Sequence, residues 1–125
     1  DTFGEGDKRN KILNEIKKKL NNNKKIIIES ENLTMNFLNV KDVINAIKLI
    51  KNKNNLKRNN YIVCNTKNFK IKEIIEKYNF LNKKKIKYKF LNTKIIDPKL
   101  PNNSKLPGWK IMHSDISDII KFLKN

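Results

Sequence analysis

The sequence predicts an α/β fold of about four helices with short strands between them. Three observations support this class. Four stretches repeat their apolar residues at helical spacing, short β-branched or aromatic runs lie between these stretches, and 125 residues with 38% apolar content suffice for one core but not for two. The strand spacing is too irregular for a complete doubly wound sheet, so we expect a partial α/β architecture that forms one domain over residues 1–125.

The first helix is predicted to follow Asp7, whose carboxylate can cap it, and to end at the asparagines of residues 21–23. Its apolar residues share one face: Ile12, Leu13, Ile16 and Leu20. Two short apolar runs, residues 26–28 and 35–38, follow with a polar turn between them. Both runs predict short strands.

A second helix is predicted to begin after Asn39, which can cap it together with Asp42 three residues later. Its apolar face is expected to consist of Val43, Ala46, Ile47 and Ile50. The stretch 51–60 is rich in Asn and Lys and predicts a loop, and residues 61–64, Tyr-Ile-Val-Cys, predict a buried strand in which Cys64 packs as a small apolar side chain.

The last third of the chain predicts two more helices and one strand. Ile71, Ile74, Ile75 and Tyr78 share a face of the third helix, and Ile86, Tyr88 and Phe90 alternate with lysines as in a half-exposed strand. Three prolines argue against regular structure over residues 92–107. Ser114 is expected to cap the last helix, with Asp115 and Asp118 in the first turn. The buried side of this helix is expected to consist of Ile116, Ile119, Ile120 and Leu123. We expect Trp109 to pack against the same helix.

The net charge of +17 allows a small basic module that binds nucleic acid or an anionic surface. We favour a solvated surface instead, because 27 of the 29 basic residues are Lys, and Arg is the better residue for bidentate base and phosphate contacts. The lysines also lack interleaved aromatic residues that could stack on bases. Nucleic acid is therefore the alternative partner.

Several classes of site are not expected. No apolar run approaches the roughly 20 residues that cross a bilayer, and the first residues do not resemble a secretory leader, so we expect a cytoplasmic protein with no membrane partner. One cysteine, Cys64, and one histidine, His113, do not make a zinc ligand set, so no metal site is expected. His113 has no sequence neighbour suited to joint catalysis, and we expect it to be structural.

Three segments carry a resemblance to a known family. Residues 1–7 read Asp-Thr-Phe-Gly-Glu-Gly-Asp, residues 35–47 contain Asn-Phe-Leu-Asn-Val-Lys-Asp-Val-Ile-Asn-Ala-Ile, and residues 106–110 read Leu-Pro-Gly-Trp-Lys. In order and spacing they resemble landmarks of the NAD(P)-dependent nucleotide-sugar epimerase/dehydratase family, the extended short-chain dehydrogenases. Within it they look most like the CDP-abequose and CDP-paratose synthase-like reductases. One departure is Met35, which stands where many members have an Arg that grips phosphate.

This resemblance implies the carboxyl-terminal substrate-binding lobe of such an enzyme. A glycine-bracketed turn with no preceding element, residues 1–6, also suggests the downstream part of a longer protein, and the Rossmann lobe is expected to be missing. The parent enzyme is expected to use NAD or NADP on a nucleotide-diphosphate sugar for surface polysaccharide or lipopolysaccharide synthesis, and a homodimer is one assembly that the resemblance allows. Epimerase, dehydratase and reductase chemistry stay open.

The family's catalytic motifs are not found in this sequence. A Gly-rich strand-turn-helix binds the cofactor pyrophosphate in such enzymes, and a Tyr-x-x-x-Lys pair moves the proton. Tyr61, Tyr78 and Tyr88 each lack a Lys four residues later. We therefore expect no catalytic residue here, no cofactor bound by this chain alone and no turnover by it.

The resemblance also implies which residues contact the nucleotide sugar. Asp1 matches an Asn that hydrogen-bonds substrate, Lys11 matches a basic position near the phosphates, and residues 27–29 match a strand whose backbone pairs with the nucleobase. A helix amino terminus there would favour the anionic diphosphate. The expected substrate-binding residues are Asp1, Lys8, Lys11, Ile12, Ile27, Ile28, Glu29 and Asn36. For Lys8 a solvated surface cation is the stronger reading, and for Asn36 a solvent-facing side chain is an equal alternative.

Overall fold

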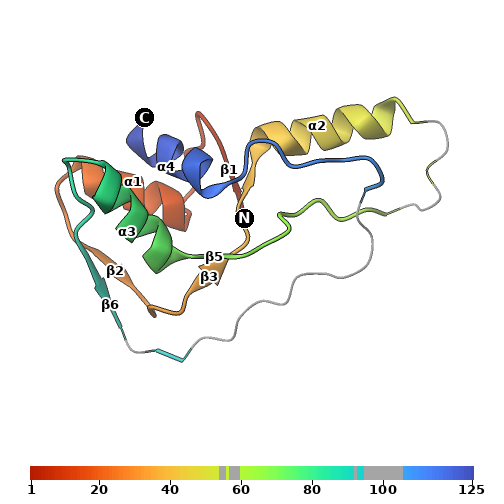
Figure 1. The fold of residues 1–125 in the computed structure, drawn as a ribbon. Helices are drawn as coiled ribbons and strands as arrows, with labels where there is room; N and C mark the ends of the chain where they lie inside the picture. The colour runs from red at the N-terminus through yellow and green to blue at the C-terminus, as the bar shows by residue number, and fades with distance from the viewer. Residues whose placement is uncertain (54–55, 57–59, 92, 95–105) are drawn as a thin grey trace.

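The computed structural model describes residues 1–53, 56, 60–91, 93–94 and 106–125. Helices and short strands alternate along the chain, so the α/β class is confirmed (Figure 1). The helices in chain order are α1 (Ile12–Asn21), α2 (Val40–Lys51), α3 (Ile71–Leu81) and α4 (Ile116–Lys124). The strands are β1 (Thr2–Phe3), β2 (Ile26–Ile28), β3 (Thr34–Met35), β4 (Leu38–Asn39), β5 (Phe69–Lys70) and β6 (Tyr88–Phe90).

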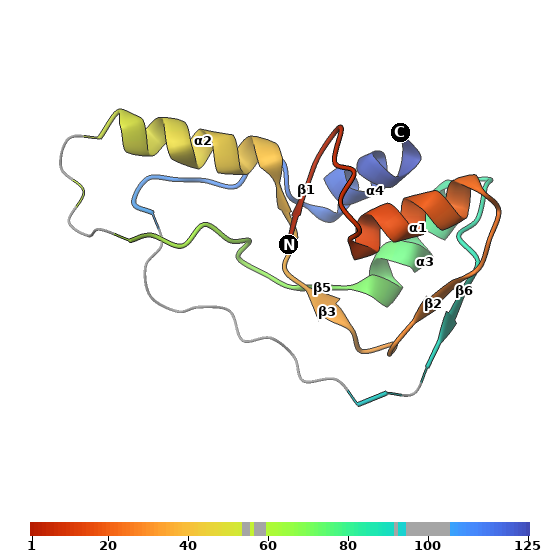
Figure 2. The same cartoon turned by 180° about the vertical axis from the view of Figure 1, so that it is seen from behind.

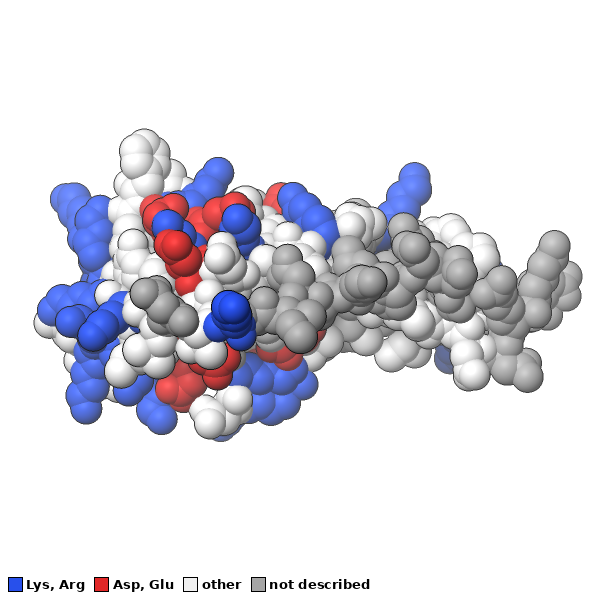
Figure 3. Space-filling model, turned by 90° about the horizontal axis from the view of Figure 1, so that it is seen from below, with Lys and Arg blue, Asp and Glu red and all other residues white. Residues whose placement is uncertain are grey.

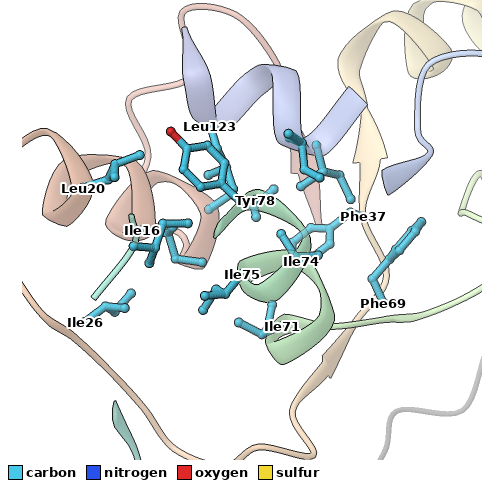
Figure 4. Close-up of a cluster of buried hydrophobic side chains, with 14 of the residues drawn as sticks. Ile16, Leu20, Ile26, Phe37, Phe69, Ile71, Ile74, Ile75, Tyr78 and Leu123 are labelled. Atoms are coloured by element: carbon cyan, nitrogen blue, oxygen red, sulfur yellow. The ribbon is translucent and has the colours of Figure 1, made fainter. Parts of the chain in front are cut away.

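Helices α1, α3 and α4 pack on one another, and β2 and β6 run beside α1 and α3; we call these five elements the body (Figures 1 and 2). Each helix buries the apolar stripe that its 3.6-residue period predicts. The predicted faces of α1 and α3 are confirmed, since Leu13, Ile16 and Leu20 of α1 and all four expected residues of α3 are buried. Figure 4 shows Ile16, Ile74, Ile75, Tyr78 and Leu123 converging on one core.

Within the described residues, the strands form three two-stranded sheets. β2 pairs with β6 in parallel, and β1 pairs with β4 in parallel, whereas β3 and β5 are antiparallel. The continuous strand expected at residues 35–38 is wrong, because Met35 pairs with Phe69 while Leu38 pairs with Thr2. Phe37 lies between these two pairings with its ring fully buried in the core, which breaks the strand.

Helix α2 and the segments 60–68 and 106–113 extend away from the body, and we call them the arm (Figures 1 and 2). The expected cap is confirmed for Asn39, whose side chain accepts from the Lys41 N–H, but not for Asp42, whose carboxylate accepts from segment 112–114 instead. The expected apolar face is wrong in part: Ala46 is buried, but Ile47 is 61% exposed. The buried side of α2 centres on Asp42 and Ala46, which face segment 106–113.

The segment 61–64 was expected to be a buried strand, and this is wrong. It is half-buried and extended, with Ile62 in an isolated bridge, and it belongs to none of the three described sheets. A strand needs a partner to complete its ladder of hydrogen bonds. Cys64 is accordingly half-buried and lines a cavity, rather than sitting inside a sheet.

Three further expectations need correction. Asp115, not Ser114, caps α4, and its carboxylate forms a capping box with Asp118. The Ser114 hydroxyl instead donates to the buried Asp42 carboxylate, which is why it is not the cap. The Trp109 indole N–H donates to the Asp42 carbonyl of α2 at 3.0 Å, so this ring lies in the arm rather than on α4.

The expected loop at 51–60 and the expected irregular stretch at 92–107 fall mainly outside the described residues. Lys51 belongs to α2, and a turn at Asn52 follows it.

Candidate functional site

Three of the residues expected at the site lie together at the amino-terminal end of α1. The Lys11 ammonium forms an ion pair with the Asp1 carboxylate and donates to the Thr2 carbonyl at 3.3 Å. The main-chain nitrogen of Asp1 donates to the Asn36 carbonyl. The Lys11 and Asp1 side chains are only 25% and 17% exposed, so this pair is held in place more firmly than a surface ion pair.

The start of α1 differs from the expectation in a way that affects this site. The helix begins at Ile12 and not after Asp7, because Lys11 occupies the N-cap position in an extended conformation (φ −120°, ψ 159°). Lys11 offers no side-chain acceptor to the first turn. The N–H groups of a first turn carry the positive end of the helix dipole. The corrected boundary therefore places Lys11 and Ile12 at a helix end that is suited to an anion.

Asp7 has a different role, which sequence reasoning missed. Its carboxylate accepts from Arg9 Nε and Nη2, each at 2.7 Å, and Arg9 Nη2 also reaches Thr2 Oγ1 at 3.0 Å. The side-chain hydrogen bond from Arg9 is the main reason that the pKa of Asp7 falls to about 2. This clamp closes the turn between β1 and α1 and offsets the charge of Arg9. The Asp-x-Arg spacing was the available signal.

Lys8 lies beside this clamp and is exposed. Its position agrees with a solvated surface cation. Ile12, by contrast, is partly buried against the core, so its contribution to the site is its main-chain N–H at the helix start.

Residues 27–29 lie on and just after β2, at the edge of the body. Ile26 N–H donates to Lys87 O and Ile28 O accepts from Leu91 N–H, both at 2.8 Å, so these groups face β6. Successive residues of a strand direct their main-chain groups to opposite edges, so the N–H and C=O of Ile27 point away from β6. β6 is the one strand that pairs with β2 among the described residues. The Ile28 side chain is buried in the core, while those of Ile27 and Glu29 are exposed.

The Asn36 side chain holds the arm rather than facing solvent. Its amide nitrogen donates to the carbonyls of Asn65 and Lys67, both at 3.1 Å, and its oxygen accepts from Asn65 N–H at 2.8 Å. These bonds fix segment 65–68 against the break between β3 and β4. The part of Asn36 that meets Asp1 is its main-chain carbonyl.

A second polar cluster joins the arm to the body. The Asp42 carboxylate is fully buried and accepts from the main-chain N–H groups of Met112 and His113 at 3.0 Å and from the Ser114 hydroxyl. The Asn65 side chain donates to the Ser114 carbonyl at 2.7 Å and to Phe37 O at 2.9 Å. The sequence predicted that Asp42 caps α2 together with Asn39, and this is wrong, because the Asp42 carboxylate is taken up by partners about 70 residues later.

No family model matches the sequence, and no curated protein matches it; solved structures do. The chain has the fold of part of RMD from Pseudomonas aeruginosa. RMD was solved in complex with NADPH, and the two structures superpose with a TM-score of 0.66 at 16% sequence identity. The match covers 98% of this chain and 44% of the RMD chain. At this identity the likeness shows a shared fold.

The fold shared with RMD includes the body and the arm, since nearly the whole of this chain is matched. The chain spans less than half of the length of RMD.

Among the described residues, no helix is long and apolar enough to cross a membrane. In the same part of the chain, no three His, Cys, Asp or Glu side chains are grouped closely enough to hold a metal ion.

A cleft of about 350 Å³ lies between the Gly4–Gly6 turn, the start of α2 and α4. Lys17, Lys41 and Lys121 line it together with His113. None of the eight residues expected at the site lines this cleft. The cleft is therefore separate from the expected site, and its charge is mixed, because Glu5 and Asp118 also line it. Of the expected residues, Asp1, Lys11 and Asn36 are brought together at the start of α1, whereas the main-chain bonds of residues 28 and 29 run to Leu91 and Thr93 and not to that group.

Proposed function

We propose that this chain is the nucleotide-sugar-binding part of an NAD(P)-dependent enzyme that epimerises, dehydrates or reduces a nucleotide-diphosphate sugar. The observation that carries the proposal is the grouping of Asp1, Lys11 and the uncapped start of α1. The likeness in fold to RMD, which was solved with NADPH, supports it. A partner lobe of the parent supplies the cofactor and the catalytic Tyr-x-x-x-Lys pair, and the parent acts in the cytoplasm in surface-polysaccharide synthesis.

Each part of the ligand meets chemistry suited to it. The diphosphate binds the Lys11 ammonium and the first-turn N–H groups of α1, because both attract an anion. The Asp1 carboxylate accepts a hydroxyl of the sugar or ribose, and Lys8 adds a second, solvated cation. The nucleobase edge pairs with the main-chain groups of Ile27 that point away from β6, flanked by Ile28 and Glu29. Asn36 positions Asp1 through its carbonyl.

Calorimetric titration tests this proposal. CDP-, UDP- and dTDP-glucose are titrated into the chain, with inorganic pyrophosphate as a charge control and a 12-nucleotide oligomer as the test of the nucleic-acid alternative. We expect at least one nucleotide sugar to bind more tightly than pyrophosphate. Binding of the oligomer at physiological salt, together with no response to any nucleotide sugar, would contradict the proposal and favour the basic-module alternative.

A matched pair of variants locates the binding. Lys11→Met and Lys18→Met remove the same charge from opposite ends of α1, and Lys18 is exposed. A hydrogen bond to a charged group is worth about 1.5–3 kcal/mol, so Lys11→Met is expected to weaken nucleotide-sugar binding by about tenfold or more. Lys18→Met is expected to change it by less than about twofold. Equal losses from both variants would mean that only net charge matters.

A further inference from the structure

Six exposed lysines come together at one end of the body. Two lie in the connection from α1 to β2, and four lie in the connection from α3 to β6. We call these six residues the basic end: Lys24, Lys25, Lys83, Lys84, Lys85 and Lys87. Neither of the sequence stretches that contain them, 16–28 and 77–91, includes an Asp or a Glu that could balance the charge.

The pairing of β2 with β6 holds the two connections side by side. Ile26 N–H donates to Lys87 O at 2.8 Å, and the Lys84 ammonium reaches Asn21 O at 3.4 Å although these two residues are 63 positions apart. Figures 1 and 2 show both connections at the end of the body opposite α2, and Figure 3 shows Lys and Arg side chains crowded at this end of the face that it draws. The fold therefore turns lysines that are scattered along the sequence into a local excess of positive charge.

Two large apolar side chains adjoin the basic end. Phe80 is 87% exposed and Leu81 is 57% exposed, and they are the last two residues of α3. Lys77 neighbours both on the helix surface, because side chains three and four positions apart lie next to each other, and Lys83 follows two residues after Leu81. An exposed apolar pair surrounded by charged side chains is typical of a contact surface.

The connection from α3 to β6 is held firmly against the end of α3. The Asn79 side chain donates to Ile86 O at 3.0 Å and accepts from Ile86 N–H at 2.7 Å, and the Ile86 side chain is buried in the core. The Lys85 ammonium also donates to the Asn79 carbonyl. The fold therefore presents the lysines of this connection beside Phe80 without any rearrangement.

This combination of cations and apolar side chains fits an anionic lipid surface. Each lysine near such a surface strengthens binding by about fivefold, and exposed Phe and Leu side chains enter the boundary between headgroups and acyl chains. Nucleic acid fits less well, because one aromatic ring does not form a stacking platform, Leu81 cannot stack on a base, and neither stretch contains an Arg. A second copy of the chain would place like charges opposite one another.

We propose that the basic end, together with Phe80 and Leu81, docks this chain reversibly on an anionic lipid bilayer. A contact of this kind needs no spanning helix, so the lack of an apolar run in the sequence does not bear on it. The first turn of α1, where the nucleotide sugar is proposed to bind, lies at the opposite end of that helix from Lys24 and Lys25. The inference goes beyond the proposed function and does not depend on it.

Vesicle flotation is the first test. The probes are vesicles of phosphatidylcholine alone and of phosphatidylcholine with about one third phosphatidylglycerol, at about 0.15 M salt. We expect the chain to float with the anionic vesicles and not with the neutral ones. Absence of binding to the anionic vesicles would overturn the proposal.

A matched pair of charge variants locates the contact. Lys83→Gln/Lys87→Gln removes two charges from the basic end, and the two lysines whose ammonium groups bond main-chain carbonyls are left unchanged. Lys48→Gln/Lys51→Gln removes the same charge from exposed positions of α2. We expect vesicle binding to fall by about tenfold or more in the first variant and by less than about threefold in the second. Equal losses would show that only net charge matters and would overturn the proposal.

A second matched pair tests the apolar part of the contact. Phe80→Ser/Leu81→Ser is compared with Ile44→Ser/Ile47→Ser, which changes two side chains of α2 that are 44% and 61% exposed. We expect the first variant to lose vesicle binding by about tenfold or more and the second by less than about threefold. Circular dichroism verifies that both are as helical as the wild type. Wild-type binding by Phe80→Ser/Leu81→Ser would show that charge alone carries the contact, and would overturn the proposal.

The conservative variant Phe80→Trp reports whether this side chain enters the lipid. The wild-type chain is the reference, because its own Trp109 lies in the arm. We expect the variant to bind vesicles as the wild type does, and the emission of the added tryptophan to shift to shorter wavelength, because indole rings settle at the headgroup boundary. An unshifted emission from vesicle-bound protein would overturn the proposal.

Two further titrations separate the other outcomes. Binding of a single-stranded oligonucleotide that Lys83→Gln/Lys87→Gln weakens, with no binding of anionic vesicles, would assign the basic end to nucleic acid and overturn the proposal. The same variant is expected to bind nucleotide sugar as the wild type does. Vesicle binding without nucleotide-sugar binding would contradict the proposed function alone, and nucleotide-sugar binding without vesicle binding would contradict the lipid contact alone.

Discussion

The body and the arm are stabilised by different forces. The body buries isoleucines and leucines from three helices in one core, so its cohesion comes mainly from the removal of apolar surface from water. The arm is held by hydrogen bonds to one buried carboxylate, Asp42, and by the Asn36 and Asn65 side chains, while its apolar residues stay partly exposed. Among the described residues, the body therefore has a closed apolar core, whereas the arm keeps apolar side chains of α2 partly exposed.

The sharpest way to break this comparison is to delete equal apolar volume in each region. Ile74 is fully buried in the body, and Ile47 is 61% exposed on α2. Ile74→Ala is expected to lower the free energy of unfolding by about 2–5 kcal/mol, because the loss of buried methyl groups leaves a cavity. Ile47→Ala is expected to change it by less than about 0.5 kcal/mol. Urea denaturation measures the free energy of unfolding of both variants. Equal losses would contradict the view that Ile74 belongs to a packed core and Ile47 to an exposed face.

The polar attachment of the arm is tested by Asp42→Ala. This change leaves two main-chain N–H groups and the Ser114 hydroxyl without their buried acceptor, at a cost of about 1–3 kcal/mol. We expect the amides of Met112 and His113 to exchange with solvent much faster, while those of α3 keep their protection. Hydrogen exchange followed by NMR distinguishes this from uniform loss of protection, which would show that Asp42 stabilises the whole molecule.

Ser114 and Asp115 are neighbours that serve different regions. Asp115 caps α4 in the body, and its loss in Asp115→Ala is expected to lower the free energy of unfolding by about 1 kcal/mol. Ser114→Ala removes a donor to Asp42 and is expected to speed exchange at residues 112–113 without fraying α4. Amide exchange at Ser117 and Asp118 measures the fraying of α4 and so distinguishes Asp115→Ala from Ser114→Ala. Fraying of α4 in Ser114→Ala would instead support Ser114 as the cap.

The smallest effect concerns the clamp at the turn before α1. Arg9 holds the pKa of Asp7 at about 2, below its usual value near 4. A carboxylate with a lowered pKa stabilises the folded state above about pH 4, and this contribution is lost as the pH falls through about 2. In Arg9→Gln the pKa of Asp7 is expected to rise toward 4. An NMR titration of the Asp7 carboxyl measures it, with Lys8→Gln as the control; an unchanged value would contradict the clamp.

The sequence predicted the body better than the arm, for a physical reason. The stripes of α1, α3 and α4 depend on local spacing, and their buried faces can be read directly from residues such as Ile16, Ile74 and Leu123. The burial of Asp42 depends on partners about 70 residues away, which no local pattern reveals. The exposure of Ile47 could not be predicted either, because helical spacing shows which side chains share a face but not whether that face is covered.

For the candidate site too, the sequence predicted some features correctly and others wrongly. The family resemblance picked out Asp1, Lys11 and Asn36, and the structure brings these residues together. Their contact follows from the pairing of β1 with β4, which is a long-range feature. The helix start was misplaced by four residues, because the expected cap was Asp7 and the observed cap is Lys11; the Asp7 carboxylate is held by Arg9 and cannot cap α1.

The central claim is that this chain binds a nucleotide-diphosphate sugar, and amide chemical shifts test it most directly. The isotopically labelled chain is titrated with the nucleotide sugar that binds best and, separately, with a single-stranded oligonucleotide. We expect the nucleotide sugar to move the amides of residues 11–14 and 27–29 most, and the oligonucleotide to cause only small, scattered changes. Nucleotide-sugar shifts spread over the lysine-rich surface, or larger and localised shifts with the oligonucleotide, would contradict the claim.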